Sequence, residues 1–180
     1  MIYQEWYLKS RWFAESAPVN PKHATASLVF TDVVVAAETV TIDGTVFEFV
    51  AAAGDIAEPT NIPVVVGTTL TSVNAVAKLV TAITATLDNV VASVGVDSNE
   101  HDYCGLAYHI VGTEGNAITV ATTCTNASFG VDVTALSGGQ FGTPCPEVNT
   151  IVKDTTYHYI CTTAGNKDDV AWERFTPETY

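Results

Sequence analysis

The chain has 180 residues, of which 47% are hydrophobic and only 15% are charged, and its formal net charge is −13 at pH 7. This length suits one domain with extensions or two small domains, and it is sufficient for a hydrophobic core. Between residues 23 and 152 the chain has thirteen acidic residues and a single basic one, Lys78. Such a body repels phosphate backbones, so we do not expect nucleic-acid binding.

The sequence also gives no sign of membrane insertion. No run of about 18 apolar residues is free of polar interruptions, so no transmembrane helix is expected. The first ten residues include Glu5 and several aromatic side chains, which is not the pattern of a signal peptide. We therefore expect synthesis in the cytosol.

Residues 1–24 are predicted to form an arm outside the main domain. Its aromatic and basic side chains are the candidate partner-binding residues: Trp6, Tyr7, Lys9, Arg11, Trp12 and Phe13. Trp, Tyr and Arg are the usual anchors of protein interfaces. Pro18 and Pro21 then interrupt regular pairing. The alternative is that the arm folds back over its own domain.

Residues 25–139 are predicted to form a β-rich body that begins with a strand over 25–35. In residues 38–50, apolar residues alternate with Thr and Glu on both sides of Asp43-Gly44. This dipeptide tolerates the positive φ of a type I′ turn, so the pattern predicts a β-hairpin. Residues 51–67, rich in Gly and Pro, are predicted to be an irregular loop.

One amphipathic helix is predicted over residues 71–87. Apolar residues recur there at steps of three and four: Val73, Val76, Ala77, Val80, Ile83 and Leu87. Thr71 can cap the start of this helix, and Asp88-Asn89 can end it. We expect the apolar stripe to pack on a sheet rather than to bind a cofactor.

The rest of the body is predicted to return to strands. Residues 90–96 alternate and indicate a strand, and the polar residues 97–102 indicate a loop. Residues 106–111 and 117–122 flank a five-residue connection rich in Gly and Asn, which predicts a second hairpin. A further strand is expected around residues 129–136.

Residues 140–180 are predicted to form a linker and a small C-terminal β-hairpin unit. The stretch 138–146 is rich in Gly and Pro, which is typical of a boundary. Short strands are expected at 150–152, 157–161 and 170–175. The predicted fold class is mainly β (α+β), with antiparallel hairpins packed against one amphipathic helix, an extended N-terminal arm and a small C-terminal β unit.

Four cysteines, Cys104, Cys124, Cys145 and Cys161, are widely spaced and contain no Cys-x-x-Cys pair. Zinc sites usually bring their ligands in close pairs, so no metal cluster is expected. The favoured interpretation is four buried free thiols, which behave as small hydrophobic groups. A disulfide, for example between Cys104 and Cys124, is the alternative in an oxidising medium.

No catalytic or cofactor motif is present, so we predict that the chain is not an enzyme and binds no cofactor. The histidines are scattered, and none lies beside a nucleophile in a recognisable setting: His23, His101, His109 and His158. Asp97, Asn99 and Asp102 could offer oxygen ligands to calcium, but no glycine stands at the sharp turn that such loops need. A solvated acidic turn is the preferred interpretation.

Several of these pieces, taken in order, resemble a small module of structural proteins of tailed bacteriophages. The matching segments are 38–49, the helix after Thr71, 112–122 and 136–139, and the resemblance in the order of elements covers residues 25–139, about two thirds of the chain. The segment from Tyr157 to Phe175 is similar to the small β-hairpin units at the ends of phage fibre and decoration proteins. The first 24 residues match no pattern of this kind.

The resemblance implies a compact unit displayed on virions. The expected function is a capsid decoration or cement protein whose arm binds the major capsid protein or another virion protein, as a homo-oligomer or symmetric array, with the virion as its location. A tail or fibre component that recognises a host glycan is the alternative. Its sugar-binding face would come from exposed aromatic residues: Tyr103, Tyr108, Tyr157 or Trp172.

Overall fold

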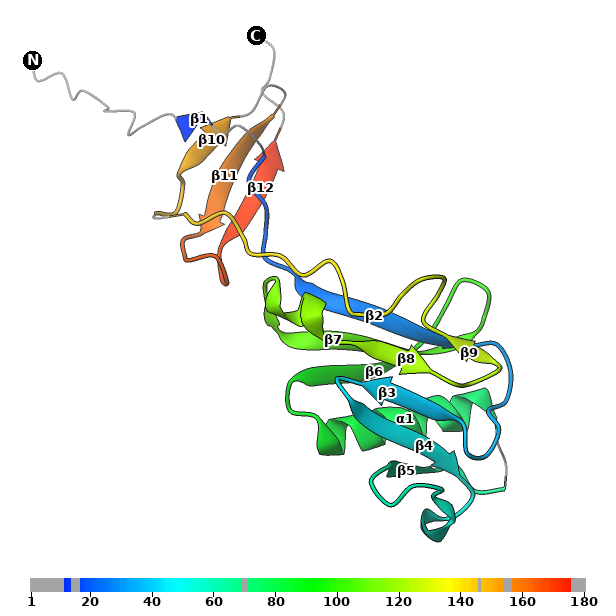
Figure 1. Cartoon of the computed structure of the whole chain (residues 1–180). Helices are drawn as coiled ribbons and strands as arrows, with labels where there is room; N and C mark the ends of the chain where they lie inside the picture. Colours follow the sequence, from blue (N-terminus) through cyan, green and yellow to red (C-terminus); the bar gives the residue numbers. More distant parts are fainter. Residues whose placement is uncertain (1–11, 14–16, 69–70, 146, 154–156, 176–180) are drawn as a thin grey trace, which may run out of the picture. The chain divides into compact units, whose positions relative to one another are not determined.

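The computed structural model describes residues 12–13, 17–68, 71–145, 147–153 and 157–175. It is mainly β, with 42% of residues in strands and 15% in helices, which confirms the predicted fold class. The described residues form three four-stranded sheets and one α-helix. The chain divides into two compact units, a larger one of residues 23–139 and a smaller one of residues 1–22 and 140–180 (Figure 1).

Two of the sheets belong to the larger unit. The strands of the first are β2 (His23–Phe30), β6 (Val90–Val96), β7 (Asp102–Val111) and β9 (Ala127–Ser128). The strands of the second are β3 (Thr39–Ile42), β4 (Thr45–Val50), β5 (Ile62–Val65) and β8 (Val120–Thr122). Their orders are β6-β7-β2-β9 and β5-β4-β3-β8, and every pairing is antiparallel except the parallel pair β4 and β5.

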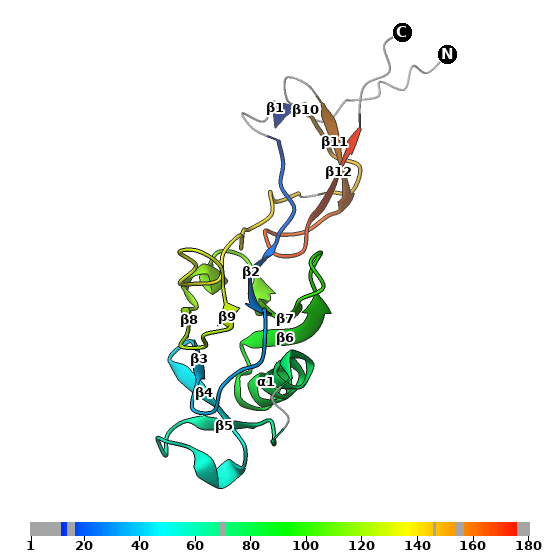
Figure 2. The same ribbon diagram turned by 90° about the vertical axis from the view of Figure 1, so that its right-hand side faces the viewer.

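The helix α1 (Ser72–Thr86) contacts strands of both sheets, chiefly β6, β7 and β5 (Figure 2). The hydroxyl of Thr71 accepts a hydrogen bond from the Asn74 amide at 3.3 Å, so Thr71 caps the helix as predicted. The buried residues of α1 are Ala75, Val76, Leu79 and Ile83. The predicted stripe is therefore wrong at Val73 and Ala77, which are exposed because the buried face is turned toward Ala75 and Leu79.

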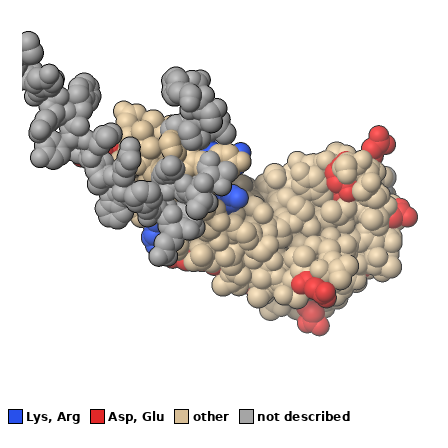
Figure 3. Space-filling view, turned by 90° about the horizontal axis from the view of Figure 1, so that it is seen from above, with Lys and Arg blue, Asp and Glu red and all other residues tan. Residues whose placement is uncertain are grey.

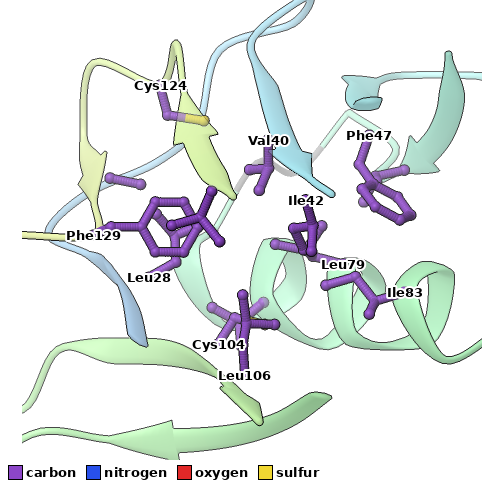
Figure 4. Packing of buried hydrophobic residues seen from close by; sticks show 14 of the residues in the cluster. Leu28, Val40, Ile42, Phe47, Leu79, Ile83, Cys104, Leu106, Cys124 and Phe129 are labelled. Carbon is purple, nitrogen blue, oxygen red and sulfur yellow. The ribbon is translucent and has the colours of Figure 1, made fainter. Parts of the chain in front are cut away.

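A single core fills the space between the two sheets and α1. It includes Leu28, Ile42, Phe47, Leu79, Ile83 and Leu106, none of them more than 2% exposed. Figure 4 shows these side chains converging from the strands and from α1 on a common interior. Fully burying one such side chain contributes about 1.5–3 kcal/mol, so this core dominates the stability of the unit.

The predicted hairpin at Asp43-Gly44 is confirmed. Ile42 and Thr45 are register partners, and φ is 50° at Asp43 and 77° at Gly44. Both central residues thus have the positive φ of a type I′ turn, whose twist matches that of the strands. The strand predicted at residues 90–96 is confirmed as β6.

The prediction of a loop over residues 51–67 is wrong for residues 62–65. They form β5, which pairs parallel with β4 at the edge of the second sheet. The segment before it contains the 3-10 turn η1 (Ala53–Asp55). Pro63 argues against a central strand because it cannot donate a ladder hydrogen bond, but an edge strand tolerates it.

The predicted second hairpin is wrong, because its two strands belong to different sheets. Strand β7 pairs with β6 on one edge and with β2 on the other, so no edge remains for β8. After the short 3-10 turn η2 (Glu114–Ala117) the chain crosses to the second sheet, where β8 pairs with β3. The local turn chemistry was compatible with either arrangement.

Two predicted strand boundaries also need correction. The first strand ends at Phe30 rather than continuing to residue 35, because the chain bends to reach the other sheet. Residues 129–136 do not form a strand beyond an isolated bridge at Ala135. Positive φ at Gly130 (96°) and Asp132 (61°) breaks the extended backbone there.

The third sheet belongs to the smaller unit. Its strands are β1 (Trp12–Phe13), β10 (Ile151–Lys153), β11 (His158–Thr163) and β12 (Ala171–Phe175), in the order β1-β10-β11-β12. Strands β10, β11 and β12 pair antiparallel, which confirms the short strands predicted near the C-terminus. Strand β1 pairs parallel with β10, which brings Trp12 and Phe13 into the same sheet as the C-terminal strands.

One carboxylate is buried in the larger unit. Glu48, on β4, is 1% exposed and accepts hydrogen bonds from the Asn61 side-chain amide at 2.7 Å and the Ala57 backbone amide at 2.8 Å. These bonds, that of Asn61 first, lower the pKa of Glu48 below its ordinary value of 4.5. Through these two hydrogen bonds, Glu48 holds Ala57 and Asn61, which precede β5, against β4.

This geometry predicts an acid-sensitive contribution to stability. Because the folded state lowers the pKa of Glu48, its stabilisation is present above pH 4.5 and is lost as the pH falls through the lowered value. We expect Glu48→Gln to be less stable than the wild type at pH 7 and to lose less stability between pH 5 and pH 3. Urea unfolding at several pH values measures this. The exposed Glu100→Gln is the matched control, and equal pH slopes for wild type and Glu48→Gln would contradict the assignment.

Candidate interaction sites

The candidate partner-binding residues lie at the start of the smaller unit. Of these, Trp6, Tyr7, Lys9 and Arg11 are outside the described residues. Trp12 and Phe13 form β1, where they are the register partners of Val152 and Lys153 on β10. The backbone of the proposed arm is thus tied to the C-terminal sheet at these two positions.

The segment that follows is also held by the smaller unit. The Asn20 side chain accepts a hydrogen bond from the Trp172 backbone N–H at 2.7 Å and donates one to the Trp172 carbonyl at 3.2 Å. Lys22 and Gln140 exchange two backbone hydrogen bonds, at 2.9 and 3.1 Å. Thr143 donates a backbone hydrogen bond to the Val19 carbonyl at 2.8 Å. Residues 17–22 therefore belong to the fold of the smaller unit.

The smaller unit has its own compact core. Its buried residues are Cys145, Val152, Tyr159, Cys161, Val170 and Trp172. The indole N–H of Trp172 donates to the Thr143 carbonyl at 2.7 Å, and the residue is only 7% exposed. The suggestion that Trp172 offers an exposed sugar-binding surface is therefore wrong, because its ring fills the core instead.

A disulfide joins Cys145 to Cys161, whose Cα atoms lie 6.5 Å apart. Cys104 and Cys124 are free and buried, so the interpretation of four free thiols is correct only for these two, and the suggested Cys104–Cys124 bond is wrong. Burial raises the pKa of Cys104 to about 12 and, as the main cause, that of Cys124 to about 11. Both thiols therefore stay protonated and inert in the native protein.

Positive charge is concentrated in the smaller unit. Residues 1–22 and 140–180 contain six of the seven basic residues and eight of the twenty acidic ones, a net charge of −2, which leaves −11 for residues 23–139. Two of these bases stack on aromatic rings: Lys167 on Phe141 at 3.6 Å and Arg174 on Tyr157 at 4.4 Å. Aromatic and Arg side chains are enriched in protein interfaces. Figure 3 shows Lys and Arg side chains (blue) as well as Asp and Glu side chains (red) on a surface that is mostly uncharged.

The residues considered for calcium do not converge. The carboxylate of Asp97 accepts hydrogen bonds from the backbone N–H groups of Asn99 and His101, both at 2.8 Å. Asp102 instead accepts a hydrogen bond from the Ser72 hydroxyl at 2.6 Å. The acidic turn is thus stabilised by its own backbone. Within the described ranges, no three His, Cys, Asp or Glu side chains gather in a way that could hold a metal ion.

A shallow hollow of about 240 Å³ lies on the outer face of the first sheet. It is lined mainly by small residues and by one aromatic ring: Thr25, Ser27, Ser93, Gly105, Ala107 and Tyr103. The Tyr103 ring lies over Gly95, where any Cβ would come within 2.2 Å of it. Gly95 therefore lets the ring lie flat across the neighbouring strand.

The other aromatic residues suggested for sugar binding have different surroundings. The Tyr108 ring packs on Gly115 and makes an edge contact with His109, with centroids 5.0 Å apart. The Tyr157 ring is covered by the Arg174 guanidinium. Of the four residues suggested, only Tyr103 lines the hollow.

Comparison of the chain with protein-family models, curated proteins and solved structures gave no match. Among the described residues, no helix is both long and apolar enough to cross a bilayer.

The disulfide makes the smaller unit sensitive to reduction. Replacing both Cys145 and Cys161 by Ser opens a loop with a sequence separation of 16 residues, which should destabilise this unit by about 3 kcal/mol. Thermal unfolding of wild type and double variant measures the difference. Thiol titration in denaturant without reductant checks the pairing: Cys124→Ser should expose one thiol if Cys145 pairs with Cys161. Three exposed thiols would mean that Cys145 and Cys161 are not joined.

Proposed function

We propose that this protein is a structural component of a tailed-phage virion, specifically a capsid decoration protein that attaches through its N-terminal segment. The observation that carries the proposal is the unequal division of charge between the two units, with −2 on the smaller and −11 on the larger. The resemblance of segments 38–49, 112–122 and 136–139 to phage structural modules supports the class. In this proposal the smaller unit binds the shell and the acidic body faces solvent.

The structure suggests how the attachment would be organised. Strand β1 pairs with β10, and Asn20 is bonded to Trp172, so Trp12, Phe13 and Asn20 are held by the smaller unit. Residues 1–11 precede β1 and include Trp6, Tyr7, Lys9 and Arg11. Aromatic and Arg side chains of this kind contribute most when they are fully desolvated in a partner's pockets. The partner would be the major capsid protein or another virion protein.

Attachment of this type stabilises the assembled shell by mass action, because only the assembled lattice offers the complete binding site. The disulfide between Cys145 and Cys161 is consistent with a particle that persists outside the cell, because disulfides are stable in oxidising surroundings. The disulfide also cross-links the unit that would carry the load of attachment.

Deletion of residues 1–11 tests the proposal directly. It removes four of the six candidate residues and leaves β1, Asn20 and the disulfide in place. We expect the truncated protein to remain folded by circular dichroism and to lose attachment to capsids in a co-sedimentation assay.

Deletion of residues 176–180 is the control, because it shortens the other end of the same unit without removing any candidate residue. We expect that variant to attach as the full chain does. Full occupancy of particles by the variant that lacks residues 1–11 would refute attachment through this segment.

A second candidate function is recognition of a host glycan by a tail or fibre component. It is favoured by the shallow hollow on the first sheet that Tyr103 lines. An aromatic ring beside the hydroxyls of Thr25, Ser27 and Ser93 combines a flat apolar surface with hydrogen-bonding groups. On this candidate, Tyr103→Ala should abolish binding on an array of host-envelope glycans, whereas Tyr157→Ala should not. No binding of the wild type to any such glycan would exclude it.

A further inference from the structure

The outer strand β6 differs from the other outer strands of the larger unit. Strand β9 has two residues, β8 has three, and β5 has four and contains Pro63. Strand β6 has seven residues, Val90–Val96, with no proline and no charged side chain. It pairs with β7 over seven consecutive residues without a bulge. Proteins normally protect exposed sheet edges with short strands, proline, charges or bulges, and β6 has none of these.

The backbone of β6 offers hydrogen bonds on its free side. The His109 amide donates to the Asn89 carbonyl at 3.0 Å, and the Asp97 amide donates to the His101 carbonyl at 2.9 Å. In an antiparallel pair the bonded residues alternate, so the odd-numbered residues of β6 bond to β7. Its even-numbered residues, Val90, Ala92, Val94 and Val96, therefore direct their N–H and C=O groups away from β7. Among the described residues, no second strand pairs with them.

Three valine side chains along this edge are exposed to water. Val91 is 57% exposed, Val94 is 55% exposed and Val96 is 60% exposed. β-Branched residues favour strands, and such a run without charge is suited to pairing with another strand. The edge thus combines free backbone groups with apolar side chains that would be buried by a neighbouring strand.

We propose that β6 pairs antiparallel with β6 of a second copy of this chain, around a two-fold axis at Ser93. In this register Ala92 lies opposite Val94, and Val90 lies opposite Val96. All four outward-facing residues of each copy then bond to one another, and Val94 and Val96 are covered. The two four-stranded sheets become one continuous sheet of eight strands. The contact is isologous and closes on itself, as in most homodimers.

The charges beside β6 favour a second copy in this register. Asn89 lies opposite Asp97, and Asp88 lies opposite Ser98, so no carboxylate meets another across the pair. A two-fold axis moved to Val94 would place Asp88 opposite Glu100, and like charges directly opposite each other destabilise a strand pair. An axis moved to Ala92 would place Asp88 opposite the apolar Val96. The remaining opposition is the long-range repulsion between two chains of net charge −13, which salt screens.

The dimer does not depend on the proposed attachment to a virion, and its test uses the purified full chain. Analytical ultracentrifugation should give a mass of twice 19.1 kDa at high protein concentration, with the dimer fraction rising between 0.05 and about 0.5 M salt as repulsion is screened. A protein that stays monomeric at every concentration and salt level would overturn the proposal.

Two variants with the same change of charge test whether the dimer interface lies at β6. Val94→Lys puts a charge on the free edge and should abolish the dimer, as lysine does on natural edge strands. Val131→Lys, at a residue that is 91% exposed outside β6, should leave the dimer intact. Equal loss of dimer in both variants would overturn the assignment to β6.

Hydrogen exchange provides a readout that does not require Val94→Lys to fold. In wild type and in Val131→Lys, the amides of Ala92, Val94 and Val96 should exchange more slowly at concentrations where the dimer forms. The amides of Val91, Ser93 and Gly95, which face β7, should change much less. Protection confined to any other strand would overturn the proposal.

Discussion

The fold of the larger unit depends on burying the apolar surfaces of its two sheets and of α1 in one common core. Each sheet has an apolar face, and both faces pack with α1 around this core. Ile42 and Phe47 come from the second sheet, Leu106 from the first, and Leu79 and Ile83 from the helix. No one of these elements could exclude water from its apolar side alone. This requirement explains why the chain crosses between the sheets, because each crossing adds a strand whose inner residues extend the same core.

The smaller unit is organised differently, since among the described residues its core contains far fewer buried apolar residues than that of the larger unit. The hydrogen bonds of Asn20 to Trp172 join segments that lie more than a hundred residues apart in sequence. The disulfide and the buried ring of Trp172 hold the C-terminal part of the unit together. The same unit contains six of the seven basic residues of the chain. The disulfide, most of the basic residues and the proposed attachment therefore belong to the same small unit, while the body supplies an acidic surface.

Local chemistry predicted the elements whose partners are near in sequence. Asp43-Gly44 needs positive φ and joins strands that pair directly, and Thr71 caps α1 through its own neighbouring amides. The alternation of residues 90–96 and of the three C-terminal strands was likewise sufficient. The buried face of the helix was less well predicted, because Val73 and Ala77 fit the same apolar period as the residues that are buried. Periodicity gives a stripe, but neighbouring elements decide which residues it buries.

The sequence by itself determined that this protein is a β-rich, acidic chain with one amphipathic helix, a type I′ hairpin and a basic, aromatic N-terminal segment. These features follow from residue types and short-range spacing. Only the tertiary structure decided that β7 and β8 belong to different sheets, that Pro63 lies in an edge strand, and that Cys145 rather than Cys104 is oxidised. Each of these depends on which distant segment occupies a free edge or reaches a sulfur atom. That choice is made by packing the whole chain, because local patterns are compatible with several partners.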